Sequence, residues 1–274
     1  MPYLEDARPL FRRAFDEGWI VPAFNVCSAE MIFAVARAAE ALRAPIVIQT
    51  YPADLALFPA PHVHALVRSV AEEASVPIAL HLDHGVDEAM GRTCLAAGFG
   101  SVMLDGAEDD LDQLVERVRT FAPEVHAANA ALEVAADGFS VAFEEATDPE
   151  AAWRLAEAGA DLVAVAVGSR HGSASHLDRE ALRALAERVA GPLVLHGGSG
   201  VPADDLAFAR SCGVAKLNVG SASYRALLQT WREAEDATSH RAVYARANEA
   251  VGAAARERIE ACGAANRDRS STLP

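Results

Sequence analysis

Residues 78–86 of this 274-residue chain read IALHLDHGV. The apolar residues at the start of the stretch predict a buried β-strand, yet His81, Asp83 and His84 lie in it or directly follow it. Burying ionisable groups is costly unless they are paired, hydrogen-bonded or bound to a metal. The stretch therefore predicts a polar site at the end of a strand, and the nature of that site depends on what other strands bring to the same place.

Short runs typical of strands alternate with alanine-rich segments of helical spacing along the chain. The expected strands are Ile20–Asn25, Ile46–Thr50, Ile78–Asp83, Ser101–Asp105, Ala131–Ala135, Leu162–Val167, Leu193–His196 and Val214–Val219. Eight strand–helix units in about 250 residues predict an α/β fold, a (β/α)8 or TIM barrel. The alternative is a doubly wound open sheet, which gives no reason for stopping at eight strands.

The same pattern predicts a single domain, because no linker rich in Pro, Gly or Ser divides the chain. We expect the barrel domain to span residues 1–266. Its C-terminal part, about 224–261, is rich in Ala, Arg and Glu and predicts one or two additional helices. Residues 267–274 are expected to form a disordered tail.

Composition narrows the classes of partner. Hydrophobic residues make up 51% of the chain and the net charge is −15, which disfavours nucleic acid and anionic membranes as partners. No apolar run is long enough to span a membrane, and the start of the chain lacks a signal-peptide core. The four scattered cysteines are expected to be free thiols of a reducing compartment, the cytoplasm.

Polar side chains follow or end most of the expected strands. In a (β/α)8 barrel the carboxyl ends of the strands form the active site. The residues expected there are Asn25, Asp83, His84, Asp105, Glu133, His171, His196 and Asn218. Three are histidines from different strands, and three protein ligands with an open fourth position describe a catalytic zinc site. The alternative is three separately satisfied core histidines.

Two glycine-rich turns follow the last two expected strands. They read HGGSG over residues 196–200 and NVGS over residues 218–221. Barrels often bind phosphate at this place through backbone N–H groups, and Gly172 after His171 extends the same region. The alternative is that these glycines only serve tight turns that need a positive φ.

Several blocks of the sequence carry a family resemblance. They are VPAFNV (21–26), HLDHG (81–85), SVMLDGA (101–107), TDPEAA (147–152), VGSRHG (167–172), LVLHGGSG (193–200) and KLNVGS (216–221). In order and spacing they resemble the signature blocks of class II, metal-dependent ketose-bisphosphate aldolases, such as the fructose- and tagatose-bisphosphate aldolases. The resemblance covers roughly residues 10–262.

This resemblance implies a zinc-dependent aldolase, with another divalent metal as the alternative. Such an enzyme reversibly cleaves a ketose phosphate or bisphosphate into dihydroxyacetone phosphate and an aldehyde through a metal-stabilised enediolate. It implies His84, His171 and His196 as metal ligands and Asp83 as the catalytic acid/base. Asp105 and Glu133 are expected beside these ligands or as alternative ligands.

The resemblance also implies a site for a small phosphorylated sugar. The residues expected to bind substrate or phosphate are Asn25, Gly172, Gly197, Ser199, Asn218, Gly220, Ser221 and Arg241. Arg241 is expected to reach the distal phosphate, often from a neighbouring subunit of a homodimer or homotetramer; the alternative is an ordinary surface arginine. A monovalent cation near the phosphate belongs to the same expectation.

The chain departs from the family pattern around the pocket. Glu133 matches the first glutamate of a Glu-x-Glu motif, but Ala135 replaces the second, and the loop that follows is short. Glu144 and Glu145 are the available candidates for the base of enolisation, with helix capping as their alternative role. Tyr51 and Arg170 replace small residues. These departures predict a substrate other than the usual one.

Two other functions compete with this interpretation. A Schiff-base aldolase needs a lysine of lowered pKa, and Lys216 is the only lysine in the chain. A catalytically lapsed aldolase-like subunit or scaffold would explain the short loop and Ala135, but it leaves the retained histidines and Asp83 without a purpose.

Overall fold

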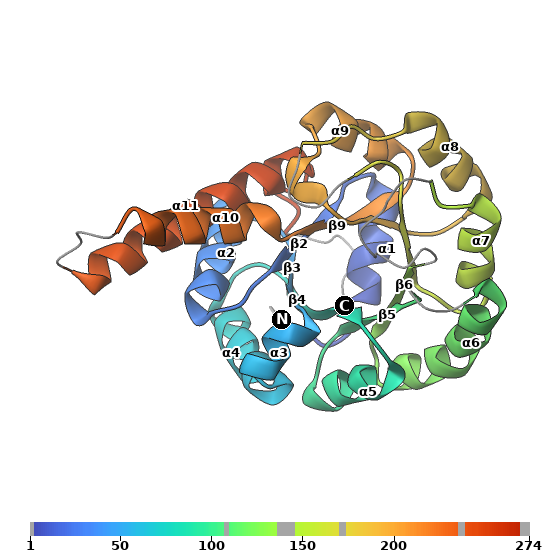
Figure 1. The fold of residues 1–274 in the computed structure, drawn as a ribbon, viewed down its shortest axis with the longest axis horizontal. Helices are drawn as coiled ribbons and strands as arrows, with labels where there is room; N and C mark the ends of the chain where they lie inside the picture. Colours follow the sequence, from blue (N-terminus) through green and yellow to red (C-terminus); the bar gives the residue numbers. More distant parts are fainter. Residues whose placement is uncertain (1–2, 107–109, 136–145, 170–173, 235–238, 269–274) are drawn as a thin grey trace.

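The computed structural model describes residues 3–106, 110–135, 146–169, 174–234 and 239–268. Strands and helices alternate along most of the chain (Figure 1). The strands are β1 (Tyr3–Leu4), β2 (Val21–Asn25), β3 (Ile46–Thr50), β4 (Ile78–Gly85), β5 (Ser101–Asp105), β6 (Ala131–Ala135), β7 (Leu162–Val165), β8 (Leu193–Leu195) and β9 (Val214–Val219). The helices are α1 (Arg8–Glu17), α2 (Ala29–Leu42), α3 (Pro52–Leu57), α4 (Ala60–Glu73), α5 (Glu88–Ala97), α6 (Leu111–Ala127), α7 (Pro149–Glu157), α8 (Arg179–Arg188), α9 (Ala203–Ser211), α10 (Ser221–Arg232) and α11 (His240–Ala261).

Strands β2 to β9 form a closed parallel barrel. Each pairs in parallel with the next along the chain, and β9 returns to pair with β2 through Val21↔Lys216 and Ala23↔Asn218. This closure confirms the predicted (β/α)8 barrel and excludes the open sheet. The eight expected strands are all present, and β1 adds a short ninth strand beside the start of β4.

Several connections between strand and helix end in an acidic cap. The side chains of Asp87, Asp110 and Asp178 accept hydrogen bonds from the first backbone N–H groups of α5, α6 and α8. These groups have no partner inside the helix, so the caps define where each helix begins after its loop. Each of these helices therefore begins at a defined residue.

The amino end of the barrel is covered by α1. Its residues Leu10, Phe11 and Ala14 are buried, and it packs against β9. Gly213, which directly precedes β9, lies so close to Phe15 of α1 that a Cβ there would be 2.9 Å from the ring. Since this end is closed, the candidate site lies at the opposite, carboxyl end, as expected for the fold.

The C-terminal segment forms two helices, α10 and α11, which pack on each other and extend from the barrel as an arm (Figure 1). The base of α11 packs on α2, while Leu228, Trp231 and Tyr244 of the arm are exposed. Two residues of the C-terminal tail, 267–274, make contacts with the barrel domain. Arg267 forms an ion pair with Glu17, and Asp268 forms one with Arg43. Among the described residues, no helix is long and apolar enough to cross a bilayer.

One ion pair lies inside the barrel, beneath the carboxyl end. Lys216 of β9 donates from Nζ to Glu133 Oε2 of β6 at 2.7 Å, and both side chains are fully buried. Lys216 also donates to Asn218 Oδ1 at 2.7 Å, and Glu133 also contacts His196. Burial by itself would raise the pKa of Glu133, but Lys216 and the neighbouring histidines lower it well below its usual range.

We expect Lys216→Met to lower the free energy of unfolding by about 3–5 kcal/mol, because it leaves the Glu133 carboxylate buried without a counter-charge. The double variant Lys216→Met/Glu133→Gln should be more stable than the single one, since a neutral amide needs no cation. Urea unfolding of the three proteins measures both effects. A single variant within about 1 kcal/mol of wild type would contradict the role given to this pair.

Candidate active site

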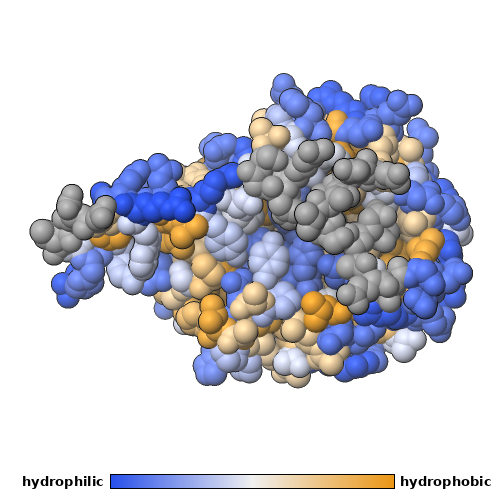
Figure 2. All heavy atoms as spheres, viewed as in Figure 1, coloured by the Kyte–Doolittle hydropathy of each residue, from blue (hydrophilic) through white to orange (hydrophobic). Residues whose placement is uncertain are grey.

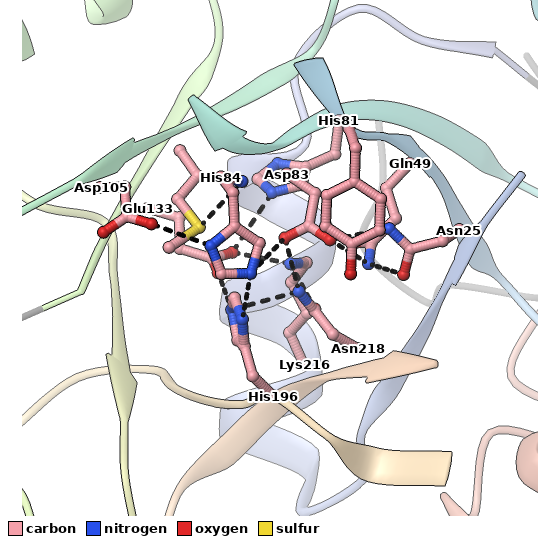
Figure 3. A network of polar contacts seen from close by, with 12 residues as sticks. Asn25, Gln49, His81, Asp83, His84, Asp105, Glu133, His196, Lys216 and Asn218 are labelled. Atoms are coloured by element: carbon pink, nitrogen blue, oxygen red, sulfur yellow. Dashed lines mark hydrogen bonds and ion pairs between the residues drawn. The ribbon is translucent and has the colours of Figure 1, made fainter. Parts of the chain in front are cut away.

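Four strands bring polar side chains together around the carboxylate of Asp83 (Figure 3). Asp83 Oδ2 accepts hydrogen bonds from Asn25 Nδ2 at 2.7 Å and from Gln49 Nε2 at 3.1 Å, and Oδ1 accepts one from Asn218 Nδ2 at 2.9 Å. Gln49 also donates to Asn25 Oδ1 at 2.9 Å. Asp83 is fully buried, so these three amides replace the water that would otherwise solvate its charge.

The environment keeps Asp83 ionised. Burial would raise its pKa, but the positive charge that His196, His84 and Lys216 can carry outweighs this effect and holds the pKa below its ordinary value. A buried carboxylate that remains charged can accept a proton from a substrate hydroxyl.

His84 owes its position to the end of β4. The strand runs two residues past the predicted end at Asp83, and its register against β5 shifts between Leu82 and Gly85. His84 has a φ of 54°, which is uncommon for a residue with a side chain. Its backbone N–H contacts the sulfur of Met103 at 3.4 Å. Backbone strain of this kind occurs mostly at functional sites, where the surrounding structure enforces it.

His84 and His196 face each other across the barrel mouth (Figure 3). His84 Nε2 and His196 Nδ1 lie 3.2 Å apart, and the two rings meet edge to face with centroids 4.9 Å apart. Each ring uses its other nitrogen to contact a carboxylate: His84 Nδ1 lies 2.9 Å from Asp105 Oδ2, and His196 Nε2 lies 2.9 Å from Glu133 Oε1.

This pairing suits a metal ion. A carboxylate beside the far nitrogen favours the tautomer that carries its proton there and its lone pair on the near nitrogen, an arrangement typical of metal-binding histidines. Within the described part of the chain, ligand atoms of Asp83, His84 and His196 lie within 4.8 Å of one another and can hold a metal ion. The donor set of imidazole and carboxylate fits zinc or a similar divalent ion.

The two histidines differ in their electrostatic environment. Burial lowers the pKa of His84, but its hydrogen bond to Asp105 and the charge of Asp83 outweigh burial and raise the pKa above its ordinary value. Burial lowers the pKa of His196, and the Glu133 hydrogen bond only partly opposes this. His196 is therefore neutral near pH 7, which is the form that ligates metals.

His81 lies behind this site and supports the barrel. Its Nδ1 lies 2.8 Å from Ser101 Oγ, and its Nε2 lies 3.6 Å from Glu133 Oε2. Burial and the nearby charge of Lys216 lower its pKa to about 3, so the ring is neutral near pH 7. This position fits a supporting role inside the barrel better than metal ligation.

The two glycine-rich turns lie side by side after β8 and β9. Gly197 has a φ of 67°, and Ser199 Oγ accepts a hydrogen bond from the backbone N–H of Ala222 at 3.1 Å. Gly220 directly precedes α10, which begins at Ser221, and a Cβ at Gly220 would be 2.9 Å from Asn25 Oδ1. The turns thus combine closely packed backbone with the N-terminus of a twelve-residue helix, a place suited to an anion.

The structure brings most of the predicted residues together at the barrel mouth. Three predicted groups cannot be placed: His171 and Gly172, Arg170, and the pair Glu144 and Glu145 lie outside the described residues. Arg241 lies at the start of α11, exposed and on the projecting arm, so this chain's own mouth does not contain it (Figure 1).

Sequence reasoning missed Gln49, which contacts Asp83 directly. The available signal was a glutamine in the expected strand 46–50, whose other residues are Ile, Val, Ile and Thr. Sequence reasoning did single out Lys216, but as the nucleophile of a rival mechanism. Its Nζ is buried and held by hydrogen bonds to Glu133 and Asn218, so it is not free to attack a substrate carbonyl, which disfavours a Schiff-base role.

Known proteins of similar sequence and structure share this architecture. Residues 5–267 match the family model of class II fructose-bisphosphate aldolases. The structure is similar to the YdjI aldolase from Escherichia coli K12, with 26% identity, a TM-score of 0.87, and coverage of 96% of this chain and 99% of that one. It is also similar to a putative fructose-1,6-bisphosphate aldolase from Coccidioides immitis, with 26% identity, a TM-score of 0.87, and coverage of 96% of this chain and 98% of that one.

A fructose-bisphosphate aldolase from Campylobacter jejuni has the same fold, with a TM-score of 0.80 at 22% identity over 96% of each chain. The family match spans nearly the whole chain, and the His84, His196 and Asp83 cluster can hold the metal on which class II aldolases depend. The chain therefore belongs to the class II fructose-bisphosphate aldolase family, a family of carbon–carbon lyases.

Proposed function

We propose that this protein is a zinc-dependent aldolase that reversibly cleaves a ketose phosphate into dihydroxyacetone phosphate and an aldehyde. The observation that carries the proposal is the facing pair His84 Nε2 and His196 Nδ1, each backed by a carboxylate, directly beside the buried Asp83. The third ligand in this proposal is His171, which follows β7 in sequence.

The bound metal supplies Lewis-acid stabilisation of the charge that develops on the substrate's carbonyl oxygen. Asp83 accepts the proton of the hydroxyl on the carbon that becomes the aldehyde, and returns it in the condensation direction. Asn25, Gln49 and Asn218 orient its carboxylate, so the proton acceptor is held in place before substrate binds. Asp105 and Glu133 orient the two histidines from behind.

The phosphate of the substrate is proposed to bind the turns after β8 and β9. Gly197, Ser199, Gly220 and Ser221 supply backbone N–H groups and hydroxyls there, with Gly172 as a further contributor. A monovalent cation beside the phosphate remains part of the proposal.

The arm supports a homodimer or homotetramer in which Arg241 reaches the mouth of a neighbouring subunit. It carries exposed Leu228, Trp231 and Tyr244, and Arg241 lies at the beginning of α11, away from its own barrel mouth.

A lapsed, non-catalytic subunit is the second candidate function, favoured by Ala135 in place of the family's second glutamate. The complete set of contacts around Asp83 favours an active enzyme, because an idle site has no need for a buried, caged carboxylate.

The first prediction concerns the metal. Purified protein should carry about one zinc or exchangeable divalent ion per chain. The variants His84→Ala, His171→Ala and His196→Ala should each lose it, because each removes a lone pair from the same ion. His126→Ala, which breaks a remote pair with Asp161, is the control and should keep its metal. Elemental analysis after dialysis measures the metal content per chain. Full metal content in all three site variants would contradict the assignment of these histidines as ligands.

The second prediction concerns Asp83. Asp83→Ala should retain the metal and still exchange a proton of dihydroxyacetone phosphate with solvent, while it loses carbon–carbon cleavage. The control is Asp87→Ala, which removes an exposed helix cap on the same loop and should cost only about 1 kcal/mol of stability. Equal turnover per folded molecule in wild type and Asp83→Ala would show that the carboxylate serves the fold alone.

The third prediction concerns the substrate. We expect fructose 1,6-bisphosphate to be cleaved weakly relative to another adduct of dihydroxyacetone phosphate. The segment after Glu133 is short in sequence, and we expect a short loop to shield less of the aldehyde half from water. Arg170 places a permanent cation next to His171 in sequence. Such a cation suits an aldehyde that bears a carboxylate, sulfonate or phosphate.

The test of this substrate preference measures steady-state cleavage in wild type and in Arg170→Ala. The substrates are fructose and tagatose bisphosphates and other ketose 1-phosphates. A kcat/KM for fructose 1,6-bisphosphate of about 10⁴ M⁻¹s⁻¹ or more, unchanged in Arg170→Ala, would favour the ordinary glycolytic substrate instead.

A further inference from the structure

The two halves of the proposed substrate extend toward different strands. The turns proposed for phosphate follow β8 and β9, whereas Asp83 and His84 end β4, which lies between β3 and β5 in the barrel. A substrate with its phosphate in the turns and its reacting carbon beside Asp83 therefore extends its aldehyde half toward the ends of β3, β4 and β5. The side chains at these ends decide which aldehydes fit.

Tyr51 lies at this place, directly after β3. Its ring stacks on the ring of His84, with centroids 5.6 Å apart and planes inclined by 25°. Its hydroxyl is also close enough to interact with Asp83. One aromatic side chain therefore contacts a proposed metal ligand and the proposed acid/base at once.

The backbone of Tyr51 is fixed by the cap of α3. Its N–H donates to Asp54 Oδ2 at 3.3 Å, and its carbonyl accepts from the N–H groups of Asp54 and Leu55 at 3.0 and 3.1 Å. Pro52 follows and favours the extended conformation that Tyr51 adopts. The short helix α3 buries none of its residues.

The rim beyond Tyr51 is apolar. Leu57, Phe58 and Val86, which follow β3 and β4, are exposed, and Figure 2 shows apolar surface in this area. Between residues 51 and 60 there is no lysine or arginine. Residues 51–60 therefore offer an aldehyde chain no cationic partner, and on this side of the mouth the shape of the surface selects what binds.

The other groups around Asp83 leave little room for adjustment. Asn25, Gln49 and Asn218 are strand residues and almost completely buried, so they cannot withdraw without disturbing the barrel. Tyr51, in contrast, belongs to no strand and is only half-buried. A substrate that approaches the carboxylate from the aldehyde side meets its ring.

We propose that Tyr51 is a specificity-determining residue whose ring forms the wall of the aldehyde subsite and limits the length of the aldehyde chain. This inference rests on the proposed aldolase function. A longer chain must displace the ring from His84 and lose the stacking contact. In a confined apolar pocket a single methylene group changes kcat/KM by about 10–200-fold, so a rigid ring is sufficient for strong selection.

The test uses ketose 1-phosphates whose aldehyde halves differ in length but carry no second charge. They are xylulose 1-phosphate, fructose 1-phosphate and sedoheptulose 1-phosphate, which release aldehydes of two, three and four carbons. Wild type should cleave the first two and discriminate against the third by about tenfold or more in kcat/KM. Tyr51→Ser should raise the ratio of the third to the first by about tenfold or more, while Tyr51→Phe, which keeps the ring, should leave that ratio within about threefold of wild type.

The ratio of substrates separates a wall from a structural role, because a residue that only supports the fold changes all kcat/KM values by the same factor. Arg12→Ser is the control: it alters an exposed residue of α1, at the opposite end of the barrel, and should leave the ratio unchanged. Metal content of each variant is measured in parallel. If wild type cleaves the panel and Tyr51→Ser leaves the ratio at its wild-type value, the inference is wrong. If wild type cleaves none of the three and no bisphosphate, the proposed function itself fails.

Discussion

The Glu133 carboxylate, buried at the centre of the barrel, is the group on which the arrangement of the mouth depends. One oxygen binds Lys216, and Lys216 in turn binds Asn218, which donates to Asp83. The other oxygen contacts His196, whose second nitrogen faces His84. A charge at this depth is tolerated only because a cation and further hydrogen bonds surround it. The same contacts that satisfy the charge place the groups of the candidate site.

Asp83 illustrates how a parallel barrel makes a reactive carboxylate available without water. Three amides from β2, β3 and β9 hold both of its oxygens, and the groups around it hold its pKa below the ordinary value. Because the donors are strand residues, they need no reorganisation when a substrate arrives. Preorganised polar groups of this kind are the largest contribution that a protein scaffold makes to most reactions.

The mouth thus combines a rigid part and a variable part. The caged Asp83, the facing histidines and the glycine turns belong to strands or to the backbone directly after them. Tyr51 and α3 lie on a connection whose residues are exposed or half-buried. A fold that divides a site in this way can keep one chemistry while its loops select different substrates.

The fold and most residues of the candidate site could be predicted from the sequence, because the patterns that indicate them are local. Alternating apolar runs and helical segments predict the barrel, and His84, Asp105 and His196 at strand ends predict a shared site. Some boundaries differ from the expected ones. Strand β4 continues to Gly85 because it bulges against β5, and such a bulge leaves no mark in a periodic pattern. The short strand β1 and the short helix α3 carried too few residues to show a period.

The contacts between side chains are what only the tertiary structure decided. The sequence by itself determined which strand ends carry ionisable groups, since strand and helix periods fix which residues reach the mouth. It could not determine that Gln49 holds Asp83, that Lys216 neutralises Glu133, or that Tyr51 stacks on His84. These pairs join residues that are 34, 83 and 33 positions apart, and the closure of the barrel brings them together. Distances across a closed sheet depend on its register and twist, which no local stretch of sequence contains.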